Sequence, residues 1–401
     1  MSDSLTISRL RIPLALCIIM IHLHMGVSGQ QIGWGCLVPM DGWRLFACVM
    51  VNEVAAIAVP LFFMISGYLF FVKFDRSAFF GKLRRRVRSL LVPYVVFNLL
   101  AAAFLVINYA QNGHTLSQGL HTYLGDGRWM HILWDSHTTG HNVNLLGISK
   151  PVSYPVNIPL WFIRDLMVLM LMAPLVYWAV RRLHWAWVLV MVALSLTGIW
   201  IPLVGFSPTS CLYFSIGALF SIKGRCMGSA FGRCSRPLLL AALPLMGLDI
   251  LADGTAADRY IHFAFLLIAV PATYGLVNRT SKGKHKSSVL SRRSHGSLLR
   301  SRADDATSNF HFSTFNSRLS APLSFFIFAF HTLPLPLLGQ RPVEWAKHLL
   351  WTDSQSALLC IAQFLGTIIL TATMCVAVYF LLYLLCPKFL AVLVGRAPKR
   401  T

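Results

Sequence analysis

The chain has 401 residues and a mean hydropathy of +0.64, with 56% hydrophobic and only 12% charged residues. A soluble domain carries roughly 25% charged residues, so this composition excludes a water-soluble protein and also a disordered chain. The net charge of +21 would fit nucleic-acid binding, but the basic residues are divided between membrane sides instead of forming one face. We therefore predict an all-α polytopic membrane protein, a single domain over residues 1–401, that binds no nucleic acid.

Long apolar stretches follow one another along the whole chain. A hydrocarbon core about 30 Å thick is crossed by roughly 20 apolar residues in a helix. Scanning at that length predicts about ten transmembrane helices, and an even number places both termini on the same side. The predicted spans are residues 8–27, 46–72, 89–110, 157–180, 183–202, 205–222, 236–252, 257–277, 319–339 and 356–386.

The positions of Lys and Arg predict which side is cytoplasmic. With the N-terminus inside, 28 of the 35 Lys and Arg residues fall in cytoplasmic segments and 7 on the opposite side. Cytoplasmic loops carry the excess of positive charge, so both termini are predicted to be cytoplasmic. The long loop 111–156 is then extracytoplasmic, and the basic Ser/Arg-rich loop 279–318 is cytoplasmic. Loop 111–156 holds several histidines, but their spacing matches no zinc pattern, so we predict no metal.

Ionisable residues within the predicted spans are the first candidates for function, because each costs at least about 2.5 kcal/mol near the bilayer centre. His262 and Asp249 have no partner by spacing and are interpreted as structural. The full set is Arg11, His22, Glu53, Arg164, Asp165, Asp249, His262 and His331.

Two histidines are expected at similar depth in the outer half of the membrane. His22 lies eleven residues after Arg11, which is about 16 Å along a helix that runs outward. His331 lies thirteen residues after Arg318, about 20 Å outward in its own span. An imidazole of this kind can accept a proton from a hydroxyl, although a single buried histidine can also be a helix-to-helix hydrogen bond.

Acidic and basic residues are expected in two layers. The second and fourth spans run inward, which places Glu53 and Asp165 near the outer face. The cluster LRRRVR and Arg11 lie at the inner edge, where arginine forks could hold phosphate, although such a cluster is also typical of plain positive-inside topology. The two layers favour a reaction with an anionic cytoplasmic donor and an acceptor on the other side.

Five stretches resemble, in order and spacing, the motifs of the integral-membrane acyltransferase family called acyltransferase 3, whose members O-acylate cell-envelope glycans in bacteria. The resemblance runs through nearly the whole chain and implies a ten-helix bundle with acyl-CoA, commonly acetyl-CoA, as donor. The chain is similar to the stand-alone subgroup without an extracytoplasmic hydrolase-like domain. The stretches are RIPLALCIIMIH (11–22), VPLFFMISGYLFF (59–71), LRRRVRSLLVPY (83–94), PLWFIRDL (159–166) and SFFIFAFHT (324–332).

The resemblance implies that Arg11 and His22 are central and that Arg86 and Arg88 help to hold the donor. We predict His22 as general base or transient acyl carrier, and His331 as a contact of the acceptor. Glu53 or Asp165 would orient His22. The predicted donor-binding residues are Arg84, Arg86 and Arg88, and the predicted substrate-binding residues are Trp161, Arg164, Ser66 and Tyr68.

These observations predict an O-acyltransferase, in the first instance an O-acetyltransferase, of the bacterial inner membrane. It would move an acyl group from cytosolic acyl-CoA to a hydroxyl of an envelope polysaccharide or a lipid-linked precursor, and polysaccharide-assembly proteins are possible partners. The alternative is a non-enzymatic exporter or flippase of a glycan or lipid-linked sugar, with the intramembrane ions lining its pathway.

Overall fold

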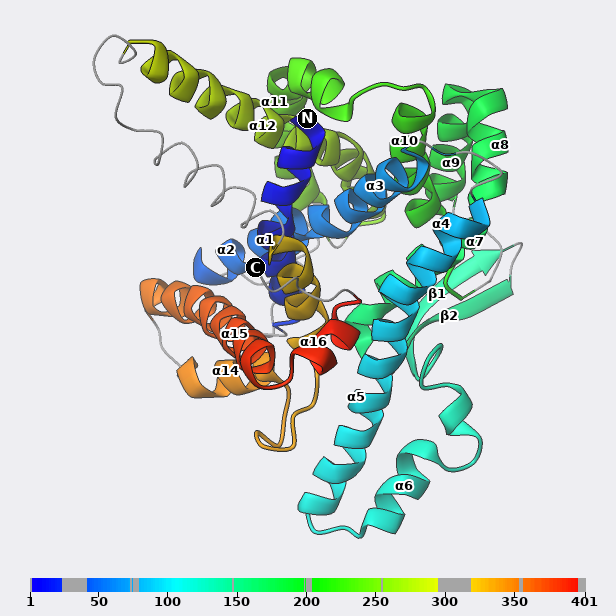
Figure 1. The fold of residues 1–401 in the computed structure, drawn as a ribbon, viewed down its shortest axis with the longest axis vertical. Helices are drawn as coiled ribbons and strands as arrows, with labels where there is room; N and C mark the ends of the chain where they lie inside the picture. The colour runs from blue at the N-terminus through cyan, green and yellow to red at the C-terminus, as the bar shows by residue number, and fades with distance from the viewer. Residues whose placement is uncertain are drawn as a thin grey trace.

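The computed structural model is a bundle of helices with one extended arm formed by α5 and α6 (Figure 1). The structure describes residues 2–23, 42–72, 74, 79–145, 148–197, 199, 204–253, 255–294, 319–352 and 356–395.

The first part of the chain forms three long apolar helical segments, each overlapping one predicted span; residues 24–27 of the first predicted span lie outside the described residues. Two of them contain π-helical turns. The segments are α1 (Ser2–Ile21); α2 (Gly42–Cys48) continued by η1 (Val49–Val54), η2 (Ala55–Ile57) and α3 (Ala58–Phe71); and α4 (Phe79–Arg86) continued by η3 (Val87–Leu91) and α5 (Val92–Gln111).

The fourth predicted span is bent in the middle. Helices η5 (Ile158–Leu160) and α7 (Trp161–Leu171) meet α8 (Ala173–Leu183) at an angle of 64°. Pro174 lies in the first turn of α8, where its missing N–H group is tolerated. Proline removes one backbone hydrogen bond and its ring crowds the preceding turn, which favours a change of direction there.

Six of the remaining eight described helices overlap the other six predicted spans, and two short ones, over residues 342–350 and 387–393, lie outside them. The helix Asp258–Ser294 continues past the predicted end at 277 and covers the first part of the predicted loop 279–318, whose remainder lies outside the described residues. These helices are α9 (Trp185–Thr197), α10 (Pro208–Ile222), α11 (Met227–Ala252), α12 (Asp258–Ser294), Leu319–Phe330, α14 (Pro342–Leu350), α15 (Ala357–Leu385) and α16 (Pro387–Leu393).

The lengths of these helices establish a polytopic membrane protein. Among the described residues, six helices are long and apolar enough to cross a membrane, and the bent pair α7 and α8 would make seven. Three further apolar helices are shorter, at 10–17 residues. The predicted helical membrane protein is therefore confirmed.

The predicted extracytoplasmic loop 111–156 contains structure of its own. The short helices α6 (Leu116–Leu124) and η4 (Arg128–Met130) lead into the antiparallel strands β1 (His137–Leu145) and β2 (Ile148–Tyr154). The prediction of an all-α chain missed this hairpin, because its Thr and Val residues, which favour strands, are interspersed with polar residues typical of a loop.

Helices α3 and α10 pack through glycines. A β-carbon on Gly67 would collide with the backbone carbonyl of Phe214, and one on Gly217 would collide with the carbonyl of Met64. Small residues let membrane helices approach closely, which is how helix pairs gain packing energy in a bilayer. The motif around Gly67 therefore fixes the position of α3, which carries part of the candidate site.

A buried carboxylate joins the start of the chain to three other helices. Asp3 accepts hydrogen bonds from the hydroxyl of Tyr68 at 2.8 Å, the hydroxyl of Tyr274 at 3.0 Å and the backbone N–H of Gly228 at 2.7 Å. These contacts tie α1 to α3, α12 and α11. Three donors compensate the negative charge, which makes its burial tolerable.

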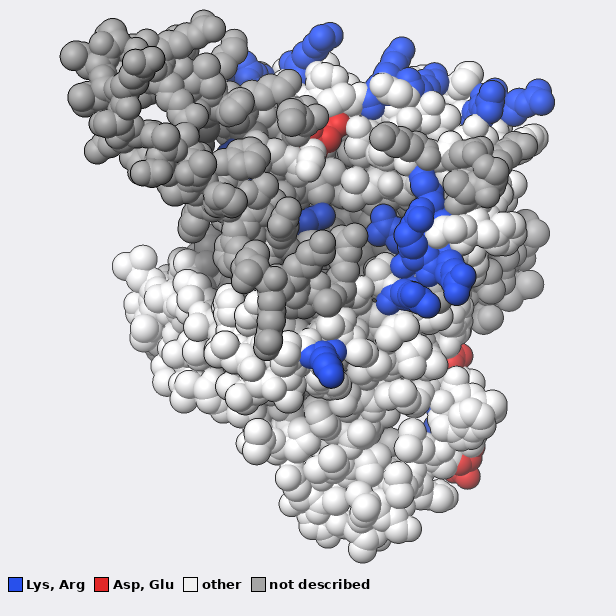
Figure 2. All heavy atoms as spheres, viewed as in Figure 1, with Lys and Arg blue, Asp and Glu red and all other residues white. Residues whose placement is uncertain are grey.

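Basic side chains are unevenly distributed over the molecule. Figure 2 shows Lys and Arg side chains gathered over α4 and at the end of the bundle where the N-terminus lies, whereas the part around α6 shows few. One arginine of α4, Arg86, also lines the cavity described next.

Candidate functional site

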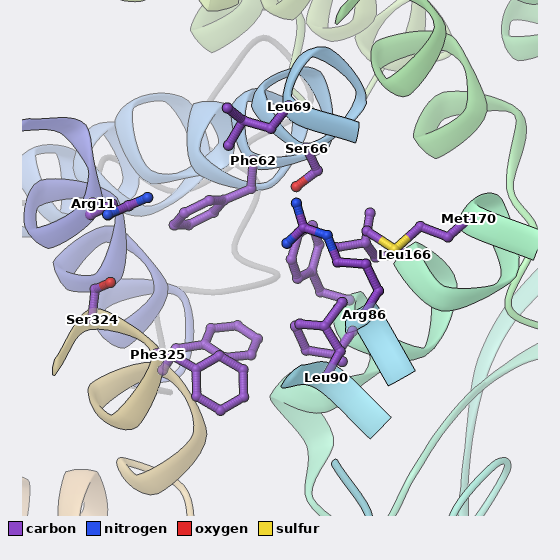
Figure 3. Close-up of a pocket in the computed structure, with 13 residues that line it drawn as sticks. Arg11, Phe62, Ser66, Leu69, Arg86, Leu90, Leu166, Met170, Ser324 and Phe325 are labelled. Atoms are coloured by element: carbon purple, nitrogen blue, oxygen red, sulfur yellow. The ribbon is translucent and has the colours of Figure 1, made fainter. Parts of the chain in front are cut away.

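A cavity of about 180 Å³ lies between α1, α3, α4, α7 and the helix Leu319–Phe330 (Figure 3). Arg11 and Arg86 supply its charged groups, and Ser66 adds a hydroxyl. Aromatic rings, among them Phe162 and Phe328, form much of the remaining wall. The cavity therefore offers two guanidinium groups beside an apolar chamber.

The structure distinguishes among the predicted donor-binding arginines. Arg86, in the last turn of α4, lines the cavity, and in Figure 3 its side chain points toward Ser66. Arg84 and Arg88 are exposed and do not line the cavity. Residues two positions apart on an α-helix point about 200° apart. Arg86 therefore turns toward the cavity, while Arg84 and Arg88 face outward.

The predicted pair of histidines comes together in space. The ring centroids of His22 and His331 are 5.2 Å apart, with the rings tilted by 53°. His22 follows the last residue of α1, and His331 follows the end of the helix Leu319–Phe330. The expectation of similar depth, made from helical rise alone, therefore holds for these two rings.

Hydrogen bonding selects one tautomer of His331. Its Nδ1 lies 3.0 Å from the carbonyl oxygen of Ile327, which can only accept a hydrogen bond, so Nδ1 carries the proton. In the neutral ring Nε2 is then a bare acceptor. The residue is 0% exposed, and within the described part of the chain Nε2 has no hydrogen-bond partner. A bare imidazole nitrogen can accept a proton from a hydroxyl, but neither His331 nor His22 is among the residues that line the cavity.

One aromatic residue of the cavity wall lies close in sequence to His331. Phe328 lines the cavity and precedes His331 by three residues, about 4.5 Å along a helix axis. Its ring is 6.0 Å from that of Phe162. Sequence reasoning did not single out these two rings, because a Phe-rich stretch in a membrane helix looks like ordinary packing.

Arg164 and Asp165 form a buried ion pair. Both Nε and Nη2 of Arg164 lie 3.0 Å from Oδ1 of Asp165, and the two residues are 3% and 4% exposed. Arg164 also donates from Nη1 to the carbonyl of Trp134 at 2.5 Å and lies over that indole ring. Asp165 is one of the two carboxylates predicted to orient His22. Its carboxylate is paired with the guanidinium of Arg164, and no described contact connects it with His22.

Glu53 lies close to Asp249 and His262, two residues that the sequence alone does not bring together with it. His262 Nδ1 lies 2.7 Å from Oδ2 of Asp249 and 4.0 Å from Oε2 of Glu53. The interpretation of Asp249 and His262 as unpartnered is therefore wrong, because the hairpin of α11 and α12 brings them together. One ligand atom from each residue falls within 4.8 Å of the others. The role of Glu53 toward His22 and the expectation of no metal both stay predictions.

The predicted substrate-binding residues occupy different places. Ser66 lines the cavity, whereas the hydroxyl of Tyr68 is bonded to Asp3. Trp161 packs at 6.5 Å from the ring of Phe63 and at 6.4 Å from that of Tyr154. Of these residues, only Ser66 belongs to the cavity.

The fold and this site define a polytopic membrane protein in which two arginines line a cavity and two histidine rings lie side by side. The sequence profile of a family described as an acyltransferase domain, acyltransferase 3, matches residues 6–385. The chain belongs to the acyltransferase 3 family, as its motifs predicted, and the prediction of an acyltransferase is confirmed at the level of the family.

One curated relative matches over part of its length. The chain is 28% identical over 198 residues to the succinoglycan biosynthesis protein ExoH of Rhizobium meliloti (strain 1021). The match covers 46% of this chain and 45% of that protein, so the chain spans less than half the length of this relative. No solved structure matches the chain.

Proposed function

We propose that this protein is a membrane O-acyltransferase that moves an acyl group from cytosolic acyl-CoA, in the first instance acetyl-CoA, to a hydroxyl of a cell-envelope polysaccharide or lipid-linked precursor. The observation that carries the proposal is the pair of adjacent imidazoles, 5.2 Å apart, of partly buried His22 and fully buried His331, in a chain of the acyltransferase 3 family. A polysaccharide acceptor is supported by the relative that is named for succinoglycan biosynthesis.

The arginines would bind the donor. Arg11 and Arg86 line the cavity, and a guanidinium binds phosphate through two parallel hydrogen bonds. Exposed Arg84 and Arg88 would attract the negatively charged donor from solution before it reaches the cavity. The acyl end of the donor would lie in the cavity, and its phosphates would lie beside Arg11 and Arg86.

The histidines would move the proton. The acceptor hydroxyl gives its proton to Nε2 of His331 as its oxygen attacks the thioester carbonyl. The new C–O bond forms, the C–S bond breaks, and the proton passes to the leaving thiolate, so that ester and free thiol are the products. His22, whose ring lies beside that of His331, would act as a second base or carry the acyl group transiently.

The proposed sidedness follows from the charge distribution. Ten spans with both termini cytoplasmic would place the α4 arginines at the cytosol and loop 111–156 outside an inner membrane. The gathering of basic side chains at one end of the molecule in Figure 2 supports this orientation. Acceptors and polysaccharide-assembly proteins would then be met on the extracytoplasmic side.

Replacing His22 with Ala tests the proposal. The variant is expressed in a deletion strain, with its amount in the membrane matched to the wild type, and envelope glycans are analysed by mass spectrometry. We expect O-acyl groups to disappear while the glycan itself remains, because removing the second base or acyl carrier beside His331 should lower the rate by about 10²–10⁴, as loss of a positioned acid–base group does. Acylation at the wild-type level in His22→Ala would contradict this role.

Loss of surface glycan from the deletion strain, with precursor retained inside, would instead support an exporter.

A further inference from the structure

We propose that Asn157 is a positioning residue that holds His331 in its proton-accepting orientation. The inference rests on the proposed function, and it assigns a task to a residue that lies just before the PLWF stretch. Asn157 is 1% exposed although it lies outside a helix. A buried polar side chain in a connecting segment needs specific partners, and these partners indicate its role.

The side chain of Asn157 binds the chain on both sides of His331. Its Nδ2 donates to the carbonyl of Ala329 at 2.9 Å, two residues before the histidine. Its Oδ1 accepts from the hydroxyl of Thr332 at 3.0 Å, one residue after it. One amide therefore clamps the short segment that carries the imidazole.

Asn157 is itself anchored to a different helix. Its backbone N–H donates to Oδ1 of Asn98 at 3.0 Å, and Nδ2 of Asn98 donates to the carbonyl of Tyr94 at 2.8 Å within α5. Asn98 is fully buried as well. The clamp is thus fixed to a long membrane helix rather than to a loop.

The segment needs an external partner because a helix ends there. The last carbonyls of a helix have no partner within it, and Ala329 lies one residue before the end of Leu319–Phe330. The tautomer of His331 depends on the same turn, since Nδ1 donates to the carbonyl of Ile327. If the turn loosens, the imidazole can rotate and Nε2 no longer holds a fixed direction toward the acceptor.

The first test is steady-state kinetics of purified wild-type protein and Asn157→Ala with acyl-CoA and isolated envelope glycan. We expect kcat to fall about tenfold to a hundredfold, since an ångström-scale misplacement of a catalytic group has effects of that size. The KM for acyl-CoA should not change, because Asn157 does not line the cavity. Thr332→Val removes only one of the two hydrogen bonds and should give a smaller loss of kcat. This milder variant keeps the test open if Asn157→Ala fails to fold.

Gln363→Ala is the matched control. Gln363 is a buried amide that donates to the hydroxyl of Thr352, in a different part of the bundle. Losing this bond should leave kcat within about twofold of the wild type. Equal effects of Asn157→Ala and Gln363→Ala on kcat, or a rise in the KM for acyl-CoA with unchanged kcat, would overturn the positioning role.

A second readout does not depend on activity. Nitrogen-15 NMR of imidazole-labelled protein reports the tautomer of each histidine, and the signals missing from His331→Gln identify those of His331. We expect the Nδ1–H tautomer in the wild type and a mixture in Asn157→Ala. An unchanged tautomer would overturn the inference even if transfer is slow. If the wild type transfers nothing from acyl-CoA, the proposed function fails, and the clamp is judged from these spectra alone.

Discussion

At the scale of residues, position on the helix decides which charges enter the site. Among the arginines of α4, Arg86 lines the cavity, while Arg84 and Arg85 are exposed. The sequence predicts the basic cluster but not which member turns inward, because that depends on how α4 is rotated against α3 and α7. The local bond that fixes the His331 tautomer is also invisible in the sequence.

Changing Arg86 to Gln should raise the KM for acyl-CoA about tenfold, because a charge-assisted hydrogen bond contributes roughly 1.5–3 kcal/mol. Arg85→Gln on the same helix removes the same charge from the surface and should change the KM by less than about threefold at physiological salt. Initial rates at varied acyl-CoA measure both. Equal increases in the two variants would mean that the cluster acts only through its net charge.

At the scale of elements, the apolar stretches predict where helices lie but not which helices touch. The pairing of His262 with Asp249 requires α11 and α12 to form an antiparallel hairpin, and hydropathy carries no information about such neighbours. Hydropathy does not predict the 64° bend between α7 and α8 either. Pro174 lies within an apolar stretch long enough for one straight span, so the stretch is interpreted as a single helix. Helical rise alone, by contrast, placed His22 and His331 at a common depth.

The contact of α3 with α10 gives an element-scale prediction. Gly67→Ala should destabilise the protein by about 1–3 kcal/mol, as overpacking does elsewhere, because the new methyl group meets the backbone of Phe214. Gly247→Ala in α11 has nothing within 4 Å of the added carbon and should be neutral or slightly stabilising. Thermal unfolding in detergent compares the two variants. A lower midpoint for Gly247→Ala than for Gly67→Ala would contradict this account of the packing.

At the scale of the whole molecule, one end is basic and the other carries the arm of α5 and α6 (Figures 1 and 2). This asymmetry was predictable from the sequence, because Lys and Arg alternate with the spans. The hairpin β1–β2 and the helical continuation of α12 to Ser294 were not, because both lie in segments of loop-like composition.

Fusions to alkaline phosphatase, which is active only outside the cytoplasm, test the orientation. A fusion after Gly113, between α5 and α6, should be active, and one after Gly224, between α10 and α11, should be inactive. The expectation follows from the excess of basic residues in the segments assigned to the cytoplasm. Green fluorescent protein at the same two sites should give the opposite pattern. Activity after Gly224 but not after Gly113 would reverse the assigned sides.

The aromatic wall of the cavity has a consequence for fidelity. Phe328 lies along its helix between Ser324, which faces the cavity near Arg11, and His331, and its ring meets that of Phe162. These rings would shield one side of a thioester held against them from water, the most abundant competing nucleophile. With the proposed thioester donor, such shielding would slow wasteful hydrolysis before an acceptor arrives.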